Sequence, residues 1–413
     1  MRRLLEKNKG GEKHTHSKAL RTNYFSLYSK NGKSFIRYID VQQVGVSMAR
    51  KIRVGIIFGG KSAEHEISLL SAKNVFEALD KTKYEPVLIG IDKNGEWHVR
   101  DALQFLLNAE NPKKVRLHGA KDHVALIAQK QNSSLVSLTQ KGSAAPLDVI
   151  FPVMHGTYGE DGAIQGLLKM AGIPFVGAGI LGSAVGMDKD VMKRLLRDAG
   201  LPIGKFLTLE SHSAKQPSFA QIVKQLGLPF FVKPANLGSS VGVSKVKKKE
   251  DYEAAVQKAF LYDHKILVEE FIEGREIECC ILGNDEPLVS LPGEVVPQDE
   301  FNTYEAKYMD DSGTIFHLPA KLDKKTAKRI QNIALDAFKA LCCEGIGRVD
   351  LFLKKNGEIY VNEINTIPGF TSTSMYPQLM AASGFPFAVV VEKLIQLALA
   401  RAEKERKLKT TFA

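Results

Sequence analysis

Apolar residues along this chain follow two spacings, one typical of β-strands and the other of α-helices. From Lys51 onward, the apolar run RVGIIFGG precedes SLLSAKNVFEALD, where apolar residues recur every three or four positions, and YEPVLIGID follows. The same order recurs in DVIFPVMHG, GEDGAIQGLLKMAG and PFVGAG. Strands that alternate with helices are typical of an open parallel sheet, which binds ligands at the carboxyl ends of its strands. The pattern therefore predicts an N-terminal α/β unit with an open parallel sheet.

Two further units of mixed helices and strands follow the first. In one of them, the helical pattern DVMKRLLRDAG precedes the strands FFVKPA and VGVSKV; the other begins near ILVEEFIEG and ends in the helix FAVVVEKLIQLALARAEKE. Residues 1–47 show no sustained helical or strand periodicity. No apolar run reaches the roughly 18 residues of a membrane span. We therefore expect a disordered segment at 1–47 and folded units at 48–176, 177–268 and 269–405.

Composition and charge narrow the class of protein. The 413 residues are 44% hydrophobic and 25% charged, enough to bury large cores. The net charge is +11, but residues 1–47 carry ten Lys and Arg against three acids, so the rest is close to neutral. This distribution argues against a nucleic-acid partner. We interpret the segment as an upstream extension before a functional start at Met48, with a basic targeting or binding arm as the alternative.

The four cysteines form two adjacent pairs, Cys279-Cys280 and Cys342-Cys343. Neither pair has the spacing of a zinc site or of a CxxC redox motif. We therefore expect reduced thiols in a cytosolic protein.

One predicted hairpin carries acidic residues in an unexpected place. In DLFLKKNGEIYVNEIN, the Asn356-Gly357 dipeptide is the one preferred in two-residue type I′ turns. A turn at that dipeptide would place Phe352 opposite Val361 and Asp350 opposite Glu363. Two carboxylates opposite each other repel and destabilise a sheet. The pattern therefore needs a reason beyond strand pairing.

A metal ion supplies that reason. The same register places Arg348 opposite Asn365, on the face that carries Asp350 and Glu363. Mg²⁺ prefers a few carboxylate or amide oxygens, with phosphate oxygens completing its octahedron. We therefore predict a metal site at Asp350, Glu363 and Asn365; the alternative is that the two acids are solvated surface charges.

A phosphate site is predicted from FFVKPANLGSSVGVSKV. Lys233 ends an apolar strand, and a loop of small residues, 236–242, leads into the next strand. Such loops turn several backbone N–H groups toward one oxyanion, and Ser239 and Ser240 add hydroxyl donors. Lys189 in GMDKDVMKRLL offers a second positive charge. Neither the P-loop nor the GxGxxG pattern is present, and an ordinary glycine-serine turn is the alternative.

Seven motifs occur in one order: FGGKSAEHEISL, HGTYGEDGAIQGLL, GMDKDVMKRLL, VKPANLGSSVGVSKV, TYEAKY, GRVDLFL and NEINTIPGFTSTS. Together they resemble the ATP-grasp superfamily and, more closely, its D-alanine–D-alanine ligases, over residues 52–400. The resemblance implies a three-domain ATP-grasp architecture. It would comprise a Rossmann-like substrate domain at 48–176, a central ATP-grasp subdomain at 177–268 and a C-terminal, metal-binding subdomain at 269–405.

The resemblance also implies roles in binding ATP. Lys189 and Lys233 would meet the phosphates, and the loop with Ser239 and Ser240 would close over them. Two Mg²⁺ (or Mn²⁺) ions would bridge the phosphates at the predicted metal site. The adenine and ribose would be held by Glu269, Glu270, Phe271, Ile272 and, on the ribose hydroxyls, Glu276.

The implied reaction joins two D-alanines into D-alanyl-D-alanine through a D-alanyl phosphate, with release of ADP and phosphate, for peptidoglycan precursor synthesis. Arg348 and the backbone N–H of Gly369 would stabilise the oxyanion. Glu64 would bind the ammonium group of the first D-alanine. The remaining assignments are His155 at the carboxylate region of the first D-alanine, Lys307 and Ser374 at the carboxylate of the second, and Tyr308 above it, hydrogen-bonded toward Ser239 and Glu64.

A cytoplasmic bacterial enzyme, forming a homodimer and without nucleic-acid or membrane partners, is what this resemblance implies. Two alternatives stay open. Another ATP-grasp ligase would keep the metal and ATP sites but join a different acid and amine. A non-catalytic nucleotide-binding protein would be expected to lose Arg348 or a metal ligand, and neither loss is seen.

Overall fold

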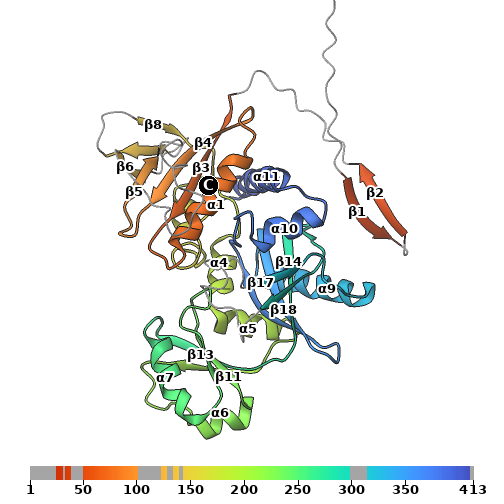
Figure 1. Ribbon diagram of the computed structural model, residues 1–413. Helices are drawn as coiled ribbons and strands as arrows, with labels where there is room; N and C mark the ends of the chain where they lie inside the picture. Colours follow the sequence, from red (N-terminus) through yellow and green to blue (C-terminus); the bar gives the residue numbers. More distant parts are fainter. Residues whose placement is uncertain are drawn as a thin grey trace, which may run out of the picture. The chain divides into compact units, whose positions relative to one another are not determined.

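The computed structural model describes residues 25–30, 33–38, 50–100, 122–127, 134–138, 143–297 and 314–409 (Figure 1). The chain divides into two compact units, Met1–Arg50 and Lys51–Ala413. The first contains an antiparallel hairpin, β1 (Phe25–Lys30) with β2 (Lys33–Tyr38). This hairpin was not expected from the sequence. Its ends, Lys30 and Lys33, are paired, which leaves between them an Asn-Gly dipeptide, the strongest short hairpin signal.

The second unit begins with a seven-stranded sheet in the order β8-β7-β6-β5-β4-β3-β9. Three strands are parallel: β3 (Ile52–Gly59), β4 (Tyr84–Ile91) and β9 (Val149–Pro152). The other four continue the sheet as antiparallel neighbours: β5 (Trp97–Arg100), β6 (Asp122–Ile127), β7 (Ser134–Ser137) and β8 (Ser143–Pro146).

The sheet is therefore mixed, whereas the sequence pattern predicted a parallel one. A tight turn is the reason: Asp92 accepts hydrogen bonds from the backbone N–H groups of Asn94 and Glu96, and the chain reverses directly from β4 into β5. The expected strand in PFVGAG is reduced to a bridge between Ile150 and Phe175. Both expected helices are present, α1 (His65–Ala78) and α3 (Ala163–Met170).

A four-stranded antiparallel sheet follows, after helices α4 (Ile180–Met187) and α5 (Lys189–Asp198). Its order is β10 (Phe206–Glu210), β13 (Lys265–Glu270), β11 (Phe230–Pro234) and β12 (Ser244–Val246). Helices α6 (Phe219–Leu226) and α7 (Lys249–Phe260) bury their apolar residues, among them Ile222 and Ala259, in one core with strand residues such as Phe230 and Val268.

The third sheet is also antiparallel, in the order β17-β16-β14-β18-β19, with β15 on β14. Its strands are β14 (Arg275–Gly283), β15 (Leu288–Val289), β16 (Gly293–Pro297), β17 (Thr314–His317), β18 (Gly345–Leu353) and β19 (Ile359–Asn365). The helices are α9 (Lys324–Ala340), α10 (Met375–Ala382) and α11 (Phe387–Arg406).

Two cores hold this third sheet to the rest of the unit. Met192 of α5 and Phe338 of α9 share one core with Val349 of β18. On the other side, Leu394 of α11 shares a core with Val75 of α1. Figure 1 shows these two helices side by side. The first sheet and the C-terminal helices are therefore packed into one body. Among the described residues, no single helix is long and apolar enough to cross a membrane; α10 and α11 pass that test only together, with a bend of 102° between them.

The hairpin β18–β19 corrects one prediction and confirms another. The turn is not a two-residue type I′ turn, because Lys354 N donates to Glu358 O at 2.9 Å and leaves a three-residue loop. Phe352 consequently pairs with Tyr360 rather than Val361. An irregularity between Asp350 and Leu351 then inserts one extra residue on β19 and shifts the register back. Beyond it, the predicted partners Asp350–Glu363 and Arg348–Asn365 are confirmed.

Candidate active site

A cleft of about 420 Å³ is lined by the four-stranded sheet, the six-stranded sheet and helix α5. Most of the residues selected from the sequence line it: Lys189, Lys233, Ser239, Ser240, Glu269, Glu270, Phe271, Ile272, Glu276, Arg348, Asp350, Glu363, Gly369 and Ser374. Glu64, His155 and Asn365 lie around this lining. Lys307 and Tyr308 fall outside the described residues.

Two buried lysines flank one carboxylate on the central side of the cleft. Lys233 Nζ lies 2.6 Å from Glu269 Oε2, and Lys193 Nζ lies 3.5 Å from Glu269 Oε1. Burial alone would raise the pKa of Glu269, but Lys193 and Lys233 hold it below its usual value. Burial lowers the pKa of Lys193. Lys193 was not selected from the sequence, although it follows Lys189 by four residues and so lies on the same face of α5.

Lys189 joins the two halves of the cleft. Its ammonium group donates to the carbonyl oxygen of Leu237 at 2.6 Å and lies 3.4 Å from Glu363 Oε2. The helix start that positions it is capped, because the Asp188 carboxylate accepts from the N–H groups of Asp190 and Val191. Lys189 thus connects residues 236–242, which we call the serine loop, to strand β19.

The serine loop holds two residues in an unfavourable backbone conformation. Ser239 and Ser240 have φ angles of 51° and 60°, the left-handed region that costs energy for residues with a Cβ. Ser239 Oγ donates to Glu64 Oε1. The loop is therefore fastened to the first sheet through a side chain.

Glu64 stands at the start of α1, where three parts of the chain converge. Its side chain is buried, and a Cβ at Gly156 would come within 2.6 Å of Glu64 Oε2. A Cβ at Gly238 would lie 3.3 Å from the same oxygen. A side chain at either position would crowd this carboxylate. Glycine is favoured at 156 for a second reason, because its φ is +74°.

Acidic side chains form a row across three neighbouring strands on the other side of the cleft. Glu278 of β14 pairs with Asp350 of β18, which pairs with Glu363 of β19. Arg348 donates to Asp350 Oδ1 and Oδ2 at 2.7 Å each, and its Nε lies 2.9 Å from Glu278 Oε2. Asn365 Nδ2 donates to Asp350 Oδ2 at 3.0 Å.

This row fits a hard divalent cation. Three carboxylates face two cationic groups, Arg348 and the Lys189 ammonium, so the strip retains negative charge. Carboxylate and amide oxygens are the donors that Mg²⁺ selects. Glu278 was missed by the sequence analysis. Glu278 follows Glu276 by two residues, so the sequence could place both on one face of a strand. The pairing of β14 with β18 is a tertiary feature, however, and no local pattern shows it.

His155 and Ser71 hold the loop that carries Gly369. His155 Nδ1 lies 2.9 Å from the carbonyl oxygen of Ile367 and therefore donates to it, so Nε2 accepts from Ser71 Oγ at 3.0 Å. Phe370 N in turn donates to Ser71 Oγ at 3.2 Å. Burial lowers the pKa of His155, which agrees with a neutral ring. Both ring nitrogens thus bind protein groups, and the side chain acts on the loop rather than on the cleft.

Glu160 clamps the same loop from the other side. Its Oε1 accepts from Ile367 N at 2.8 Å and its Oε2 accepts from Gly156 N at 2.9 Å. Burial, together with the charge of Glu64, raises the pKa of Glu160 to about 8. Ser71 and Glu160 were not selected from the sequence, because each acts through a contact with a segment far away along the chain.

Gly369 and Ser374 bound the end of the cleft next to α10. A Cβ at position 369 would meet Ser374 Oγ at 2.8 Å, so glycine permits this close approach. Ser374 Oγ accepts from Thr371 N at 3.1 Å and fixes the loop before the helix. The backbone N–H of Gly369 is thereby held at the cleft wall.

The segment expected to bind adenine forms the opposite end. Glu270 Oε1 accepts from Lys205 N at 2.7 Å, which secures the strand end. Phe271 is 39% exposed, and Lys245 Nζ lies 4.5 Å from the centroid of its ring. An exposed aromatic face beside a cation offers a stacking surface. Ile272 and Glu276 line the same end.

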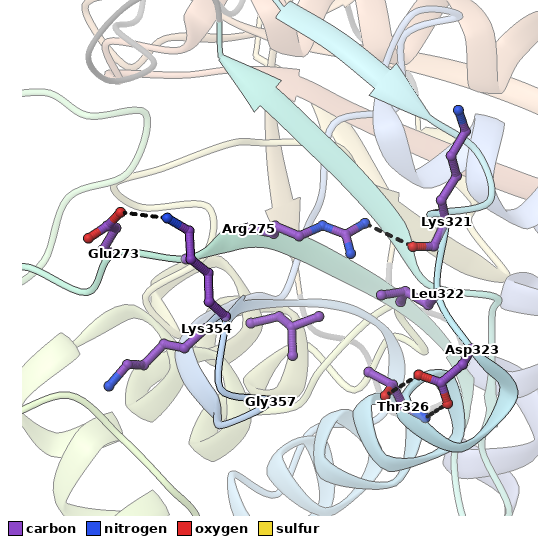
Figure 2. Close-up of a pocket in the computed structure, with 11 residues that line it drawn as sticks. Glu273, Arg275, Lys321, Leu322, Asp323, Thr326, Lys354 and Gly357 are labelled. Carbon is purple, nitrogen blue, oxygen red and sulfur yellow. Dashed lines mark hydrogen bonds and ion pairs between the residues drawn. The ribbon is translucent and has the colours of Figure 1, made fainter.

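Several polar groups of a neighbouring cavity of about 460 Å³ are already paired (Figure 2). Arg275 binds Glu294 through two hydrogen bonds, at 2.7 and 2.8 Å, and donates to the carbonyl oxygen of Lys321 at 3.1 Å. Asp323 caps α9 by accepting from the N–H groups of Lys325 and Thr326. These contacts stabilise the edge of the third sheet.

Comparisons with known proteins cover nearly all of the second unit. Residues 53–178 match the family model described as the D-ala D-ala ligase N-terminus, and residues 195–396 match the D-ala D-ala ligase C-terminus. A D-alanine–D-alanine ligase of Oceanobacillus iheyensis is 51% identical over 361 residues, which is 87% of this chain and 99% of that protein.

Solved structures give the same match. The D-alanine–D-alanine ligase of Coxiella burnetii superposes with a TM-score of 0.77 at 39% identity, over 87% of this chain and 97% of that one. The VanG D-Ala:D-Ser ligase of Enterococcus faecalis superposes with a TM-score of 0.75 at 37% identity, over 84% of this chain and 100% of that one.

Proposed function

The chain belongs to the D-alanine–D-alanine ligase family, and from that premise we propose that its cleft joins two D-alanines into D-alanyl-D-alanine at the expense of ATP. The observation that carries this proposal is the charge pattern of the cleft. Lysines from the central part of the chain face a row of carboxylates from the C-terminal part across one cavity. Such a cavity suits a substrate that is both a polyanion and a carrier of Mg²⁺.

ATP would bind with its phosphates between these two sets of charges. Lys189, Lys193 and Lys233 would meet the phosphate oxygens, and the serine loop would cover them. The adenine would lie on Phe271 and the ribose at Glu276. Asp350, Glu363 and Asn365 would hold two Mg²⁺ ions (or Mn²⁺), which neutralise phosphate charge when bound.

The first step activates a carboxylate. A carboxylate is a poor electrophile because it is negatively charged and would have to expel oxide. Transfer of the γ-phosphoryl group to an oxygen of the first D-alanine gives an acyl phosphate and ADP. Such a transfer depends on positioning and charge neutralisation, which the buried lysines supply without a protein nucleophile.

The second step forms the peptide bond. The amine of the second D-alanine attacks the carbonyl carbon, a C–N bond forms, the C–O bond to phosphate breaks, and the amine gives up a proton. Negative charge develops on the carbonyl oxygen, where fixed donors are most effective. Arg348, held in place by Asp350 and Glu278, and the Gly369 N–H would be these donors.

Substrate contacts follow from the same site. Glu64 would pair with the ammonium group of the first D-alanine, and Ser374 with the carboxylate of the second. From the family resemblance, Lys307 would bind the same carboxylate. Tyr308 would lie above it as part of a closing lid. We assign His155 to positioning, since it orients the loop that presents Gly369.

An assay of acceptor dependence tests the proposal. Purified protein is supplied with ATP and Mg²⁺, and ADP and products are measured with D-alanine, L-alanine, D-serine, D-lactate or no amino acid. D-alanine should give one ADP per dipeptide and the highest turnover. ADP release that does not depend on D-alanine would indicate a different ATP-grasp ligase. No ADP release under any of these conditions would indicate a nucleotide-binding protein without ligase activity.

Two further properties are inferred from the family. We propose a homodimer that works in the bacterial cytoplasm. Light scattering coupled to size-exclusion chromatography should give twice the 45.5 kDa of one chain. A mass of one chain at assay concentration would contradict the dimer. Fractionation of the native host should leave the protein with the cytosol, and recovery in the membrane pellet would contradict that location.

A further inference from the structure

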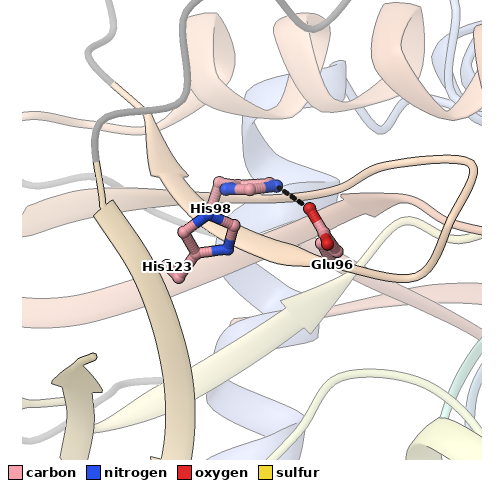
Figure 3. A group of neighbouring side chains, drawn as sticks. All are labelled: Glu96, His98 and His123. Atoms are coloured by element: carbon pink, nitrogen blue, oxygen red, sulfur yellow. Dashed lines mark ion pairs between the residues drawn. The ribbon is translucent and has the colours of Figure 1, made fainter. Parts of the chain in front are cut away.

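A cluster of imidazole and carboxylate groups lies in the seven-stranded sheet and takes no part in the ligase cleft. His98 of β5 and His123 of β6 are paired residues in the antiparallel ladder. Their ring centroids are 4.6 Å apart. Glu96 directly precedes β5, and its Oε2 lies 3.9 Å from His98 Nε2. Figure 3 shows the three side chains turned toward one another.

The geometry points to a transition-metal site: we propose that Glu96, His98 and His123 bind one Zn²⁺ ion. One ligand atom from each residue lies within 4.8 Å of the other two. Zinc holds nitrogen and oxygen ligands at 2.0–2.2 Å, so its ligands lie roughly 3.3 Å apart. Glu96 and His123 are exposed, so their side chains would have to rotate by this difference around buried His98 to coordinate one ion.

The donor set selects the metal. Two imidazoles and one carboxylate are borderline ligands, which suit Zn²⁺ and disfavour Mg²⁺, an ion that prefers oxygen alone. Two carboxylates already face the buried ring: His98 Nε2 lies 3.9 Å from Glu96 Oε2 and 3.8 Å from Asp92 Oδ2. Asp92 is held by the turn through its Oδ1. Its Oδ2 would be the candidate for a fourth ligand or for a partner of a bound water.

The position suggests a structural role. The ladder between β5 and β6 has two residue pairs, His98–His123 and Val99–Asp122. This short ladder is where strands β6, β7 and β8 join the rest of the sheet through β5. A metal held by both strands cross-links this junction. Binding to the folded state alone raises stability by RT ln(1 + [Zn²⁺]/Kd).

Zinc titration of tag-free, EDTA-treated full-length protein tests the proposal. Excess Mg²⁺ is kept in every sample to occupy oxygen-only sites in the cleft. The wild type should bind one Zn²⁺, and Glu96→Gln and His123→Ala should each weaken that binding at least about tenfold, since loss of a second-shell partner alone costs 10–100-fold. Both altered side chains are exposed, and circular dichroism checks that the variants fold.

His212→Ala is the matched control, because His212 is an exposed histidine whose Nε2 lies 3.3 Å from Glu210 Oε2. It should bind zinc like the wild type. Hydrogen exchange supplies a second readout: zinc should slow exchange in residues 122–127 of the wild type but not of His123→Ala. Equal zinc affinity in the wild type, Glu96→Gln and His123→Ala would overturn the proposal, as would the absence of a zinc-dependent change in exchange.

Discussion

Charged side chains in the cleft stabilise one another in pairs, and this pairing determines what a bound nucleotide has to replace. Glu269 forms ion pairs with Lys193 and Lys233, and Arg348 forms a bidentate hydrogen bond with Asp350. An unpaired charge removed from water costs several kcal/mol. The pairs therefore keep lysines and carboxylates buried and oriented. Phosphate oxygens and Mg²⁺ can then take over partners that already face the cavity.

Glu363→Gln tests whether Glu363 is a Mg²⁺ ligand, because it replaces one carboxylate oxygen by an amide nitrogen. A neutral amide coordinates Mg²⁺ more weakly than a carboxylate, so turnover should fall at least about tenfold at low Mg²⁺ and recover in part at saturating Mg²⁺. The measurement is the Mg²⁺ dependence of dipeptide synthesis. Glu358→Gln, an exposed carboxylate beside the turn of the same hairpin, should behave like wild type. An unchanged Mg²⁺ dependence in Glu363→Gln would exclude it as a ligand.

Glu160 predicts a pH dependence of stability. Its pKa of about 8 in the folded protein exceeds the ordinary 4.5, so between these values the folded state binds a proton that the unfolded chain has lost. The free energy of unfolding should therefore fall as pH rises across this range. Glu160→Gln has no proton to lose, so its stability should fall less between about pH 5 and pH 8.

Urea denaturation of the wild type and Glu160→Gln across this pH range provides the measurement. Glu253→Gln, an exposed carboxylate on α7, is the control and should follow the wild type. Parallel pH profiles for the wild type and Glu160→Gln would show that Glu160 keeps an ordinary pKa.

At the scale of elements, local sequence predicted the acidic hairpin and missed how it is built. The Asn-Gly dipeptide correctly indicates a reversal, but it does not settle between a two-residue and a three-residue loop. The longer loop shifts the register by one residue, and the extra residue on β19 shifts it back. Asp350 and Glu363 face each other because two deviations cancel. Turn chemistry is local, whereas a bulge depends on the strands on both sides.

Helix α5 presents Lys189 and Lys193 to the cleft, so its first turn should matter for ATP. Asp188→Ala removes the cap of the helix, which should cost about 1 kcal/mol of stability and raise the KM for ATP. Asp323→Ala removes an equivalent cap from α9, far from the lysines, and should leave the KM for ATP unchanged. Steady-state kinetics and urea denaturation of both variants measure the difference. If Asp188→Ala and the wild type have the same KM for ATP, the cap of α5 does not contribute to ATP binding.

At the scale of the whole molecule, the sequence revealed the order of units but not the contacts between them. Apolar periodicity placed α1, α5 and α11 and the principal strands, because those signals are local. The contacts that complete the site join distant segments: Glu64 with Ser239, Glu160 with Ile367, and Glu278 with Arg348. No pattern within one stretch encodes such pairs. The antiparallel extension of the first sheet was missed for a related reason, since the Asp92 turn decides strand direction.

Removal of residues 1–47 should leave folding and turnover intact. The family models begin at residue 53, and Met1–Arg50 is a unit separate from Lys51–Ala413. A chain that starts at Met48 should therefore keep its melting temperature and its kcat with D-alanine. Differential scanning calorimetry and steady-state kinetics make the comparison. A drop in melting temperature of several degrees would mean that the segment packs on the folded body.

Oxygen transfer from substrate to phosphate tests the central claim most directly. D-alanine labelled with ¹⁸O in its carboxylate is converted in the presence of ATP and Mg²⁺, and the released phosphate and dipeptide are analysed by mass spectrometry. If the carboxylate is activated as an acyl phosphate, each phosphate should carry one ¹⁸O for every dipeptide formed. Phosphate without ¹⁸O, released whether or not dipeptide appears, would contradict the account, because its fourth oxygen would then have come from water.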